Sequence, residues 1–230
     1  LDAYRYDYFK KYSRFDGDLS RVLTQGNWSM EWVLKNFEGQ DLTDTVIVSA
    51  NPFYERLDED SVFMLESIEN EDPTITTERA LELNERYANK RLIIHYMVPH
   101  QPHRGEIARE FADGGEKFAN IWELFRNSKI SEDEMIASYV QNIEIAEDHA
   151  ESILDKLNGK TVITSDHGEN LGEIQFGIQR LDHGHETPEC RYVPWLKLPF
   201  DERKTVTSDD PVGFNYEGVI GERLEDLGYL

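Results

Sequence analysis

Three short runs of nearly continuous apolar residues, set apart by longer stretches, limit the folds that this chain can adopt. They read DTVIVSAN at positions 44–51, RLIIHYMVP at 91–99 and KTVITSD at 160–166. Strands that are apolar along both faces are typical of a parallel sheet covered by helices on each side. Because helical stretches separate the runs, they predict an α/β fold: a doubly wound, mostly parallel sheet flanked by helices.

The clearest helix is predicted between Ser131 and about position 157. Apolar residues recur there every three or four positions and form one stripe along the segment. Ser131 and Glu134 have the spacing of a capping box, and the Asn-Gly pair at 158–159 supplies a stop signal. A second helix is predicted to follow Trp28.

The length of 230 residues suits a single domain over positions 1–230. Residues 1–3 resemble the end of a strand, so we expect the first core strand to be truncated at the N-terminus. YVPWLKLP at 192–199 is a further candidate strand. The region 57–79 and the tail after Pro199 are polar and rich in turn-forming residues, and both are predicted to lie on the surface.

The charge balance is strongly acidic, with 46 acidic and 24 basic residues and a formal net charge of −22. Such a surface repels phosphate backbones and anionic lipids, which disfavours nucleic-acid and membrane-surface binding. The acidic residues are spread along the whole chain, as in proteins of salt-loving organisms, whose cytoplasm screens this repulsion.

No apolar run is long enough to span a bilayer, and no secretory signal is present in the sequence. We therefore expect a cytoplasmic protein of a high-salt organism. A part in a membrane-associated pathway stays open, and the sequence does not indicate an oligomeric state.

Acidic and histidine side chains follow the predicted strands at their carboxyl ends, where ligands gather in open α/β sheets. These residues are Asp2, His95, His100, His103, Asp166, His167, His183 and His185. Their predicted clustering in space, more than any single residue, indicates a site.

The segment SDHGE is the most informative part of this set. Adjacent Asp166 and His167 at a strand exit can turn toward one cation, and Gly168 permits the sharp turn that follows. Glu169 and Glu173 are expected to orient these ligands. The alternative is a capped turn in which Asp166 accepts backbone hydrogen bonds and His167 is merely exposed.

TVITSDHGENLGE resembles the metal-binding signature of the alkaline phosphatase/sulfatase superfamily, particularly its sulfatase-like and phosphoglycerol-transferase-like branches. Three other segments agree with that family in order: LDAYRYDYF at the start, HYMVPHQPH at 95–103 and DHGHETPECRYVPW at 182–195. The resemblance extends from Asp2 to Trp195. It implies an alkaline-phosphatase-like core and, together with the acidic composition, an origin in a halophilic archaeon.

The resemblance also implies roles for individual residues. Asp2, Asp166 and His167 would bind the metal, and Ser29 would be a nucleophile bound to that metal at a helix N-terminus. His100 would contact the anionic oxygens of the substrate or protonate the leaving group. One of two late histidines would complete the metal site, the candidates being His183 and His185, and substrate contacts would come from His95, His103 and Arg5.

Simpler interpretations stay open for several of these residues. Ser29 could serve only as a helix cap, His95 could be a hydrogen-bonded core histidine, and Arg5 could form a structural ion pair. His100 and His103 flank two prolines in a rigid turn, which favours display over burial.

The resulting prediction is a metal-dependent hydrolase or transferase of phosphate or sulfate esters, acting on an anionic small molecule or glycan ester. One divalent cation is expected, Mn, Ca, Mg or Zn, with room for a second. HYMVPHQPH lacks the Asp four residues before a His that two-metal phosphatases use, which favours a single metal site. No C-x-P-x-R motif of the sulfatases is present, which favours phosphate over sulfate esters. The alternative is a non-catalytic, anion- or glycan-binding descendant of the same fold.

Overall fold

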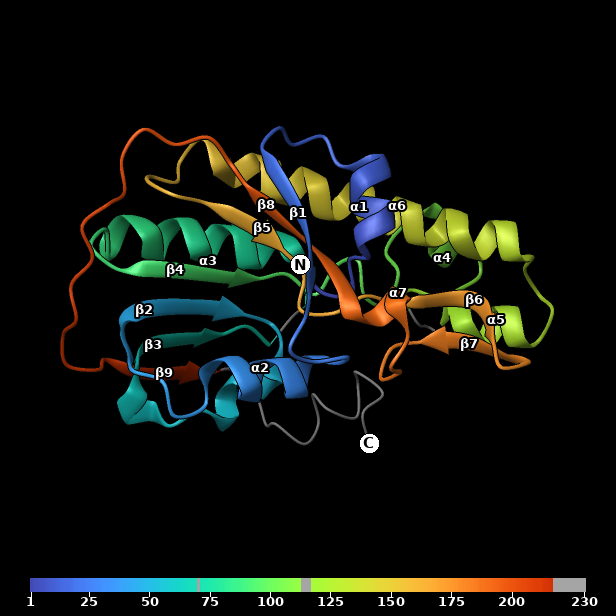
Figure 1. Ribbon diagram of the computed structural model, residues 1–230, viewed down its shortest axis with the longest axis horizontal. Coiled ribbons are helices and arrows are strands. Elements are labelled where there is room, and N and C mark those ends of the chain that lie inside the picture. Colours follow the sequence, from blue (N-terminus) through green and yellow to red (C-terminus); the bar gives the residue numbers. More distant parts are fainter. Residues whose placement is uncertain (70, 113–116, 217–230) are drawn as a thin grey trace.

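A four-stranded parallel sheet forms one part of the computed structural model, which describes residues 1–69, 71–112 and 117–216 (Figure 1). Its strand order is β4-β2-β3-β9, and each neighbouring pair is parallel. The four strands are β2 (Leu42–Ser49), β3 (Val62–Ser67), β4 (Arg91–His95) and β9 (Gly213–Tyr216). Residues 217–230, which the single-domain prediction includes, lie outside the described residues.

Helices cover both faces of this sheet, as the apolar runs predicted. Val46 and Val48 of β2 share one apolar cluster with residues of α3 and with Ile153 of α6. Ile47 points to the opposite face, where it joins a cluster that includes Val33 of α2. The helices are α1 (Tyr6–Tyr12), α2 (Ser29–Phe37), α3 (Pro73–Arg86), α4 (Glu106–Glu110), α5 (Ile121–Arg126), α6 (Glu132–Leu154) and α7 (Pro188–Arg191), with 3-10 helices η1 (Pro52–Arg56) and η2 (Glu59–Ser61).

A second sheet contains antiparallel strands in the order β1-β8-β5. Its strands are β1 (Asp18–Leu23), β8 (Tyr192–Lys197) and β5 (Val162–Thr164), and a separate hairpin pairs β6 (Asn170–Gln175) with β7 (Ile178–Asp182). The first residues of the chain lie at the carboxyl ends of both β4 and β5 (Figure 1). The fold class is therefore α/β, with a parallel sheet flanked by helices.

The long helix predicted from Ser131 is confirmed as α6, and its capping box is present. The Ser131 hydroxyl accepts a hydrogen bond from the Glu134 backbone, and the Glu134 carboxylate accepts one from the Ser131 backbone. The helix ends at Leu154, three residues before the expected end at 157. Within the described residues, no helix combines the length and the apolar character that crossing a bilayer requires.

The prediction that residues 57–79 lie on the surface is wrong. This region contributes β3, all of whose residues are buried between β2 and β9. Its polar residues misled the prediction because they are paired: the Glu66 carboxylate forms an ion pair with Arg79, and Ser67 donates to Glu55. The tail after Pro199 does lie on the surface, since residues 200–215 are all exposed or half-buried, and it adds β9 as an edge strand.

Candidate metal centre

Four predicted side chains from distant parts of the sequence meet at one point. The hydroxyl of Ser29 lies 3.1 Å from Asp2 Oδ2, 2.8 Å from Asp166 Oδ2 and 3.3 Å from His167 Nε2. Asp2 stands between the carboxyl ends of β4 and β5, Asp166 and His167 directly follow β5, and Ser29 is the first residue of α2. All four side chains are buried.

Local hydrogen bonds fix the carboxylate of Asp166. Its Oδ1 accepts the backbone N–H groups of Ala3, at 3.2 Å, and of His167, at 2.8 Å, which leaves Oδ2 facing Ser29. Position 168, two residues after Asp166, must be glycine, because a Cβ at Gly168 would collide with the carbonyl oxygen of Glu189. Asp166 therefore accepts backbone hydrogen bonds, as the alternative for SDHGE expected, and also faces the other three side chains. The expectation in that alternative that His167 is exposed is wrong, because His167 is buried.

The residue after Asp2, Ala3, has a strained backbone conformation. Ala3 has a φ of 60°, in the left-handed region that residues with a Cβ seldom adopt. The Asp2 N–H donates to the carbonyl oxygens of Tyr96 and Val98, which holds the residue between the two sheets. Strained conformations of this kind persist where surrounding contacts fix them and are frequent at functional sites.

The donor atoms of Asp2, Asp166 and His167 fit a divalent cation. One ligand atom from each lies within 4.8 Å of the others, and Asp2 Oδ1 is buried with no hydrogen-bond partner in the described structure. Burial alone would raise the pKa of Asp2, but the nearby rings of His100, His95 and His167 outweigh it and hold that pKa below the usual range. Two carboxylates, an imidazole and a hydroxyl are donors that Mn²⁺, Mg²⁺ and Zn²⁺ accept.

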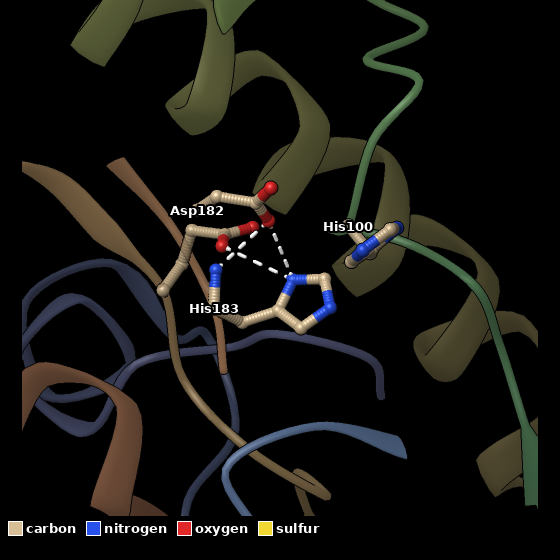
Figure 2. A group of neighbouring side chains, drawn as sticks. His100, Asp182 and His183 are labelled. Carbon is tan, nitrogen blue, oxygen red and sulfur yellow. Dashed lines mark hydrogen bonds and ion pairs between the residues drawn. The ribbon is translucent and has the colours of Figure 1, made fainter. Parts of the chain in front are cut away.

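A second group of possible ligands adjoins the first and consists of His100, Glu169, Asp182 and His183. The ring of His183 stacks on that of His167, with centroids 4.6 Å apart, and lies 4.9 Å from that of His100. Figure 2 shows the Asp182 carboxylate against the backbone and ring nitrogens of His183, with the His100 ring nearby; the carboxylate oxygen is 2.7 Å from Nδ1.

Glu169 is the unusual member of this second group. The residue is 0 % exposed, and neither carboxylate oxygen has a hydrogen-bond partner in the described structure. The nearest cationic atom is His183 Nδ1, 3.6 Å away. Burial raises the pKa of Glu169, although the neighbouring His183 opposes this; burial by itself would lower the pKa of His183, but Asp182 and Glu169 raise it well above its usual range.

His95 has the contacts expected of a hydrogen-bonded core histidine, and it also contacts the first group of possible ligands. Its Nε2 lies 3.1 Å from Asp2 Oδ2, so the ring supports the first group. Its Nδ1 lies 3.1 Å from the hydroxyl of Tyr54, and the ring is buried, as expected of a hydrogen-bonded core histidine. Of the two late histidines, His183 belongs to the second group, whereas His185 belongs to neither of the groups found among the described residues.

The prediction that His100 and His103 are displayed is wrong. His103 is 0 % exposed, its Nδ1 lies 2.9 Å from the hydroxyl of Ser138, and its ring packs against Trp122, so it is not placed to touch a substrate. Burial lowers the pKa of His103 to about 3. His100 is also buried but faces the second group.

Arg5, the other predicted substrate contact, is held in a network of carboxylates. Its guanidinium forms ion pairs with Asp7, at 2.7 Å, and with Glu173, and donates to the backbone carbonyl of Glu169. Arg5 therefore forms the structural ion pair that the sequence analysis gave as the alternative to a substrate contact. Glu173 therefore positions Arg5, and Arg5 in turn fixes the backbone of the residue that follows Gly168.

Two residues of the site were missed in the sequence. Asp182 precedes His183 in a second copy of the tripeptide Asp-His-Gly, which also forms 166–168, and this repetition was the available signal. Asn51 follows β2 and donates from Nδ2 to Asp2 Oδ2 at 3.3 Å. The position of Asn51 at the carboxyl edge of the sheet could have indicated it.

Comparisons with known proteins give structural likenesses at low sequence identity, one of which is described here. No family model and no curated protein matches the chain. It is similar to the solved structure described as "Integral membrane protein lipooligosaccharide phosphoethanolamine transferase A (EptA) from Neisseria meningitidis", with 14 % sequence identity and a TM-score of 0.48. The likeness covers 78 % of this chain and 41 % of that one, so the chain matches less than half of its neighbour's length.

Proposed function

We propose that the chain transfers or hydrolyses phosphate or sulfate esters with the help of a divalent cation, with Ser29 as the nucleophile. The observation that supports this best is the position of the Ser29 hydroxyl, between two carboxylates and an imidazole, at 3.1, 2.8 and 3.3 Å. A hydroxyl used only as a helix cap would instead bond to backbone N–H groups of its own helix. The cap residue of α2 is Trp28, whose side chain makes no capping bond.

Asp2, Asp166 and His167 would hold the cation, with Ser29 beside it. A divalent cation at this position supplies a Lewis acid that favours an ionised hydroxyl and balances charge on the transferring group. The first turn of α2 adds backbone N–H groups that lack carbonyl partners within the helix, and its dipole favours anionic oxygens. The motif resemblance and the donor set together support a phosphate or sulfate ester as the substrate class.

In the proposed first step, the Ser29 oxygen forms a bond to phosphorus while the bond from phosphorus to the leaving oxygen breaks. The hydroxyl proton would leave to solvent, because Asp166 Oδ2, the carboxylate oxygen closest to the hydroxyl at 2.8 Å, would be taken up as a cation ligand. His100 and His183 lie next to His167 and would donate hydrogen bonds or a proton to the leaving oxygen. Water or an alcohol then attacks the phosphoserine and frees Ser29, which completes hydrolysis or transfer.

The second group would accept a second divalent cation. Glu169 supports this proposal, since a buried carboxylate with two unpartnered oxygens is costly unless a cation or a proton neutralises it. Asp182 and His183 would complete the donor set, with His100 at its edge. The net charge of −22 further favours a high-salt cytoplasm as the working environment.

A binding protein without turnover is the second candidate. Its support is the burial of Ser29, whose side chain is 0 % exposed, because a nucleophile must be reached by its substrate. In that case the chain would keep the cation and bind an anion or glycan ester through it.

The experiment measures hydrolysis of chromogenic phosphate monoesters, phosphate diesters and sulfate esters in high KCl, with Mn²⁺, Mg²⁺, Ca²⁺ or Zn²⁺ added. Ser29→Ala should lower kcat by on the order of 10³-fold or more and should keep cation binding. Ser20→Ala, at an exposed position of β1, is the matched control and should leave turnover unchanged. Unchanged turnover in Ser29→Ala would remove Ser29 as the nucleophile, and bound cation without turnover on any ester would favour the binding protein.

A further inference from the structure

A chain of hydrogen bonds leads from the hydroxyl of Tyr54 through the ring of His95 to Asp2. The Tyr54 hydroxyl lies 3.1 Å from His95 Nδ1, and His95 Nε2 lies 3.1 Å from Asp2 Oδ2. Tyr54 belongs to η1, His95 ends β4, and Asp2 stands between the carboxyl ends of β4 and β5. The three residues are 0 %, 4 % and 0 % exposed, so their side chains bond to one another rather than to bulk water.

The acceptors along this path determine which nitrogen of His95 carries the hydrogen. An ionised carboxylate only accepts hydrogen bonds, so the hydrogen lies on Nε2 and points at Asp2 Oδ2. A neutral ring then has a lone pair at Nδ1, and the Tyr54 hydroxyl donates to it. With Tyr54 as the acceptor instead, its buried hydroxyl hydrogen would have no acceptor, because Tyr54 makes no second side-chain hydrogen bond within the described residues.

His167 faces the same carboxylate in the opposite tautomer. Its Nδ1 lies 2.9 Å from the backbone carbonyl oxygen of Gly168, which is an acceptor, so a neutral ring carries its hydrogen on Nδ1. Nε2 of His167 therefore presents a lone pair, 3.3 Å from Asp2 Oδ1. The two rings thus differ in what they offer to Asp2: His167 offers a ligand atom for a shared cation, and His95 offers a hydrogen-bond donor.

The two oxygens of Asp2 are correspondingly unequal. Oδ2 lies within hydrogen-bond distance of three donors: His95 Nε2, Asn51 Nδ2 at 3.3 Å and the Ser29 hydroxyl at 3.1 Å. Oδ1 is buried and has no hydrogen-bond partner in the described structure. Because the donors on Oδ2 fix the plane of the carboxylate, Oδ1 is the oxygen left to bind a cation.

We propose that Tyr54 is a positioning residue of the metal centre: it holds His95 in the tautomer whose Nε2–H occupies Asp2 Oδ2, so that Oδ1 faces the cation. His95 then contacts neither cation nor substrate and acts on Asp2 alone. The role toward a cation rests on the proposed function, whereas the tautomer can be measured without any cation. Hydrogen bonds that orient a ligating group typically change metal affinity by about 10- to 100-fold.

The first measurement uses the chain labelled with ¹⁵N in histidine, in high KCl with chelator, at about pH 8, above the ordinary histidine pKa of about 6.5. Long-range ¹H–¹⁵N NMR spectra distinguish a ring nitrogen that carries a hydrogen from one with a lone pair. The signals of His95 are identified by their loss in His95→Leu. Nε2 of His95 should carry the hydrogen and Nδ1 the lone pair; a hydrogen on Nδ1, with or without one on Nε2, would overturn the proposal.

The second measurement is the Kd for Mn²⁺ and for Zn²⁺, by titration calorimetry. Tyr54→Phe removes only the hydroxyl and should weaken cation binding by about 10- to 100-fold. Tyr96→Phe is the matched control, since it removes another buried hydroxyl, which lies 2.9 Å from that of Thr77, and it should leave the Kd unchanged. His95→Leu should weaken binding at least as much as Tyr54→Phe, and the double variant should show no further loss, because Tyr54 acts through His95.

Two results of the titration would overturn the proposal. One is an unchanged Kd in Tyr54→Phe, or a loss equal to that in Tyr96→Phe. The other is a pair of additive losses from Tyr54→Phe and His95→Leu, since Tyr54 would then act by packing alone. A wild type that binds no cation would refute the proposed function, whereas the wrong tautomer in a chain that does bind cation would refute only this inference.

Discussion

Asp166→Asn separates two effects of one carboxylate in the candidate metal centre. The charged side chain faces Asp2, with ligand atoms of the pair within 4.8 Å, and it accepts the Ser29 hydroxyl at 2.8 Å. Asparagine has nearly the same shape, and its side-chain oxygen can still accept the backbone N–H groups of Ala3 and His167. The substitution therefore removes one charge and one cation ligand while it keeps the turn.

The estimated free energies predict that Asp166→Asn changes the stability little without cation and lowers it relative to the wild type when cation is present. Two carboxylates whose oxygens lie within 4.8 Å of each other repel by at least about 3.5 kcal/mol at an effective dielectric constant of 20. Loss of a hydrogen bond to a charged acceptor costs about 1.5–3 kcal/mol, so in chelator the two terms nearly cancel. A cation at 100 times its Kd stabilises the wild type by about 2.7 kcal/mol. That gain corresponds to roughly 5–11 °C in Tm for a chain of this length.

The assay is thermal unfolding of both proteins in high KCl, first with chelator and then across a titration of Mn²⁺ or Zn²⁺. Asp166→Asn should unfold within about 2 kcal/mol of the wild type in chelator and should lose most of the cation-induced rise in Tm. Asp201→Asn, at an exposed carboxylate, is the control and should retain the whole rise. A full rise in Asp166→Asn would refute the ligand assignment, and a large loss of stability in chelator would show that the carboxylate is chiefly a structural anchor.

Two further predictions concern stability: one follows from the net charge of the chain and the other from the buried imidazole of His103. Raising KCl from 0.1 M to 1 M should increase Tm, because the net charge is −22 and the Debye length falls from about 10 Å to 3 Å; an unchanged or lower Tm would contradict this. His103 has a pKa of about 3 when folded, against a usual 6.5, so only the unfolded chain takes up this proton as the pH falls between those values. His103→Gln should therefore lose stability toward acid less steeply, by about 1.4 kcal/mol per pH unit in this window, in urea unfolding at several pH values; equal slopes would refute the assignment.

Much of the fold could be predicted from short-range patterns. The runs at 44–51, 91–99 and 160–166 became β2, β4 and β5, and the capping box at Ser131 marks the start of α6. Strand β3 was missed because Glu66 and Ser67 suggested a surface segment. Their burial depends on Arg79 and Glu55, partners that hydropathy along the chain does not reveal.

The candidate metal centre could likewise be predicted from the sequence only in part. The sequence alone determined that Asp166 and His167 stand together at a strand end, because neighbours on a short turn are held by bonds within a few residues. Only the tertiary structure decided that Asp2 and Ser29 meet this pair, that His183 and not His185 joins Glu169, and that His103 is enclosed. Those distances arise from the packing of sheets and helices, whose contacts join residues up to 168 positions apart. Patterns read over a few neighbouring positions carry no information on such separations.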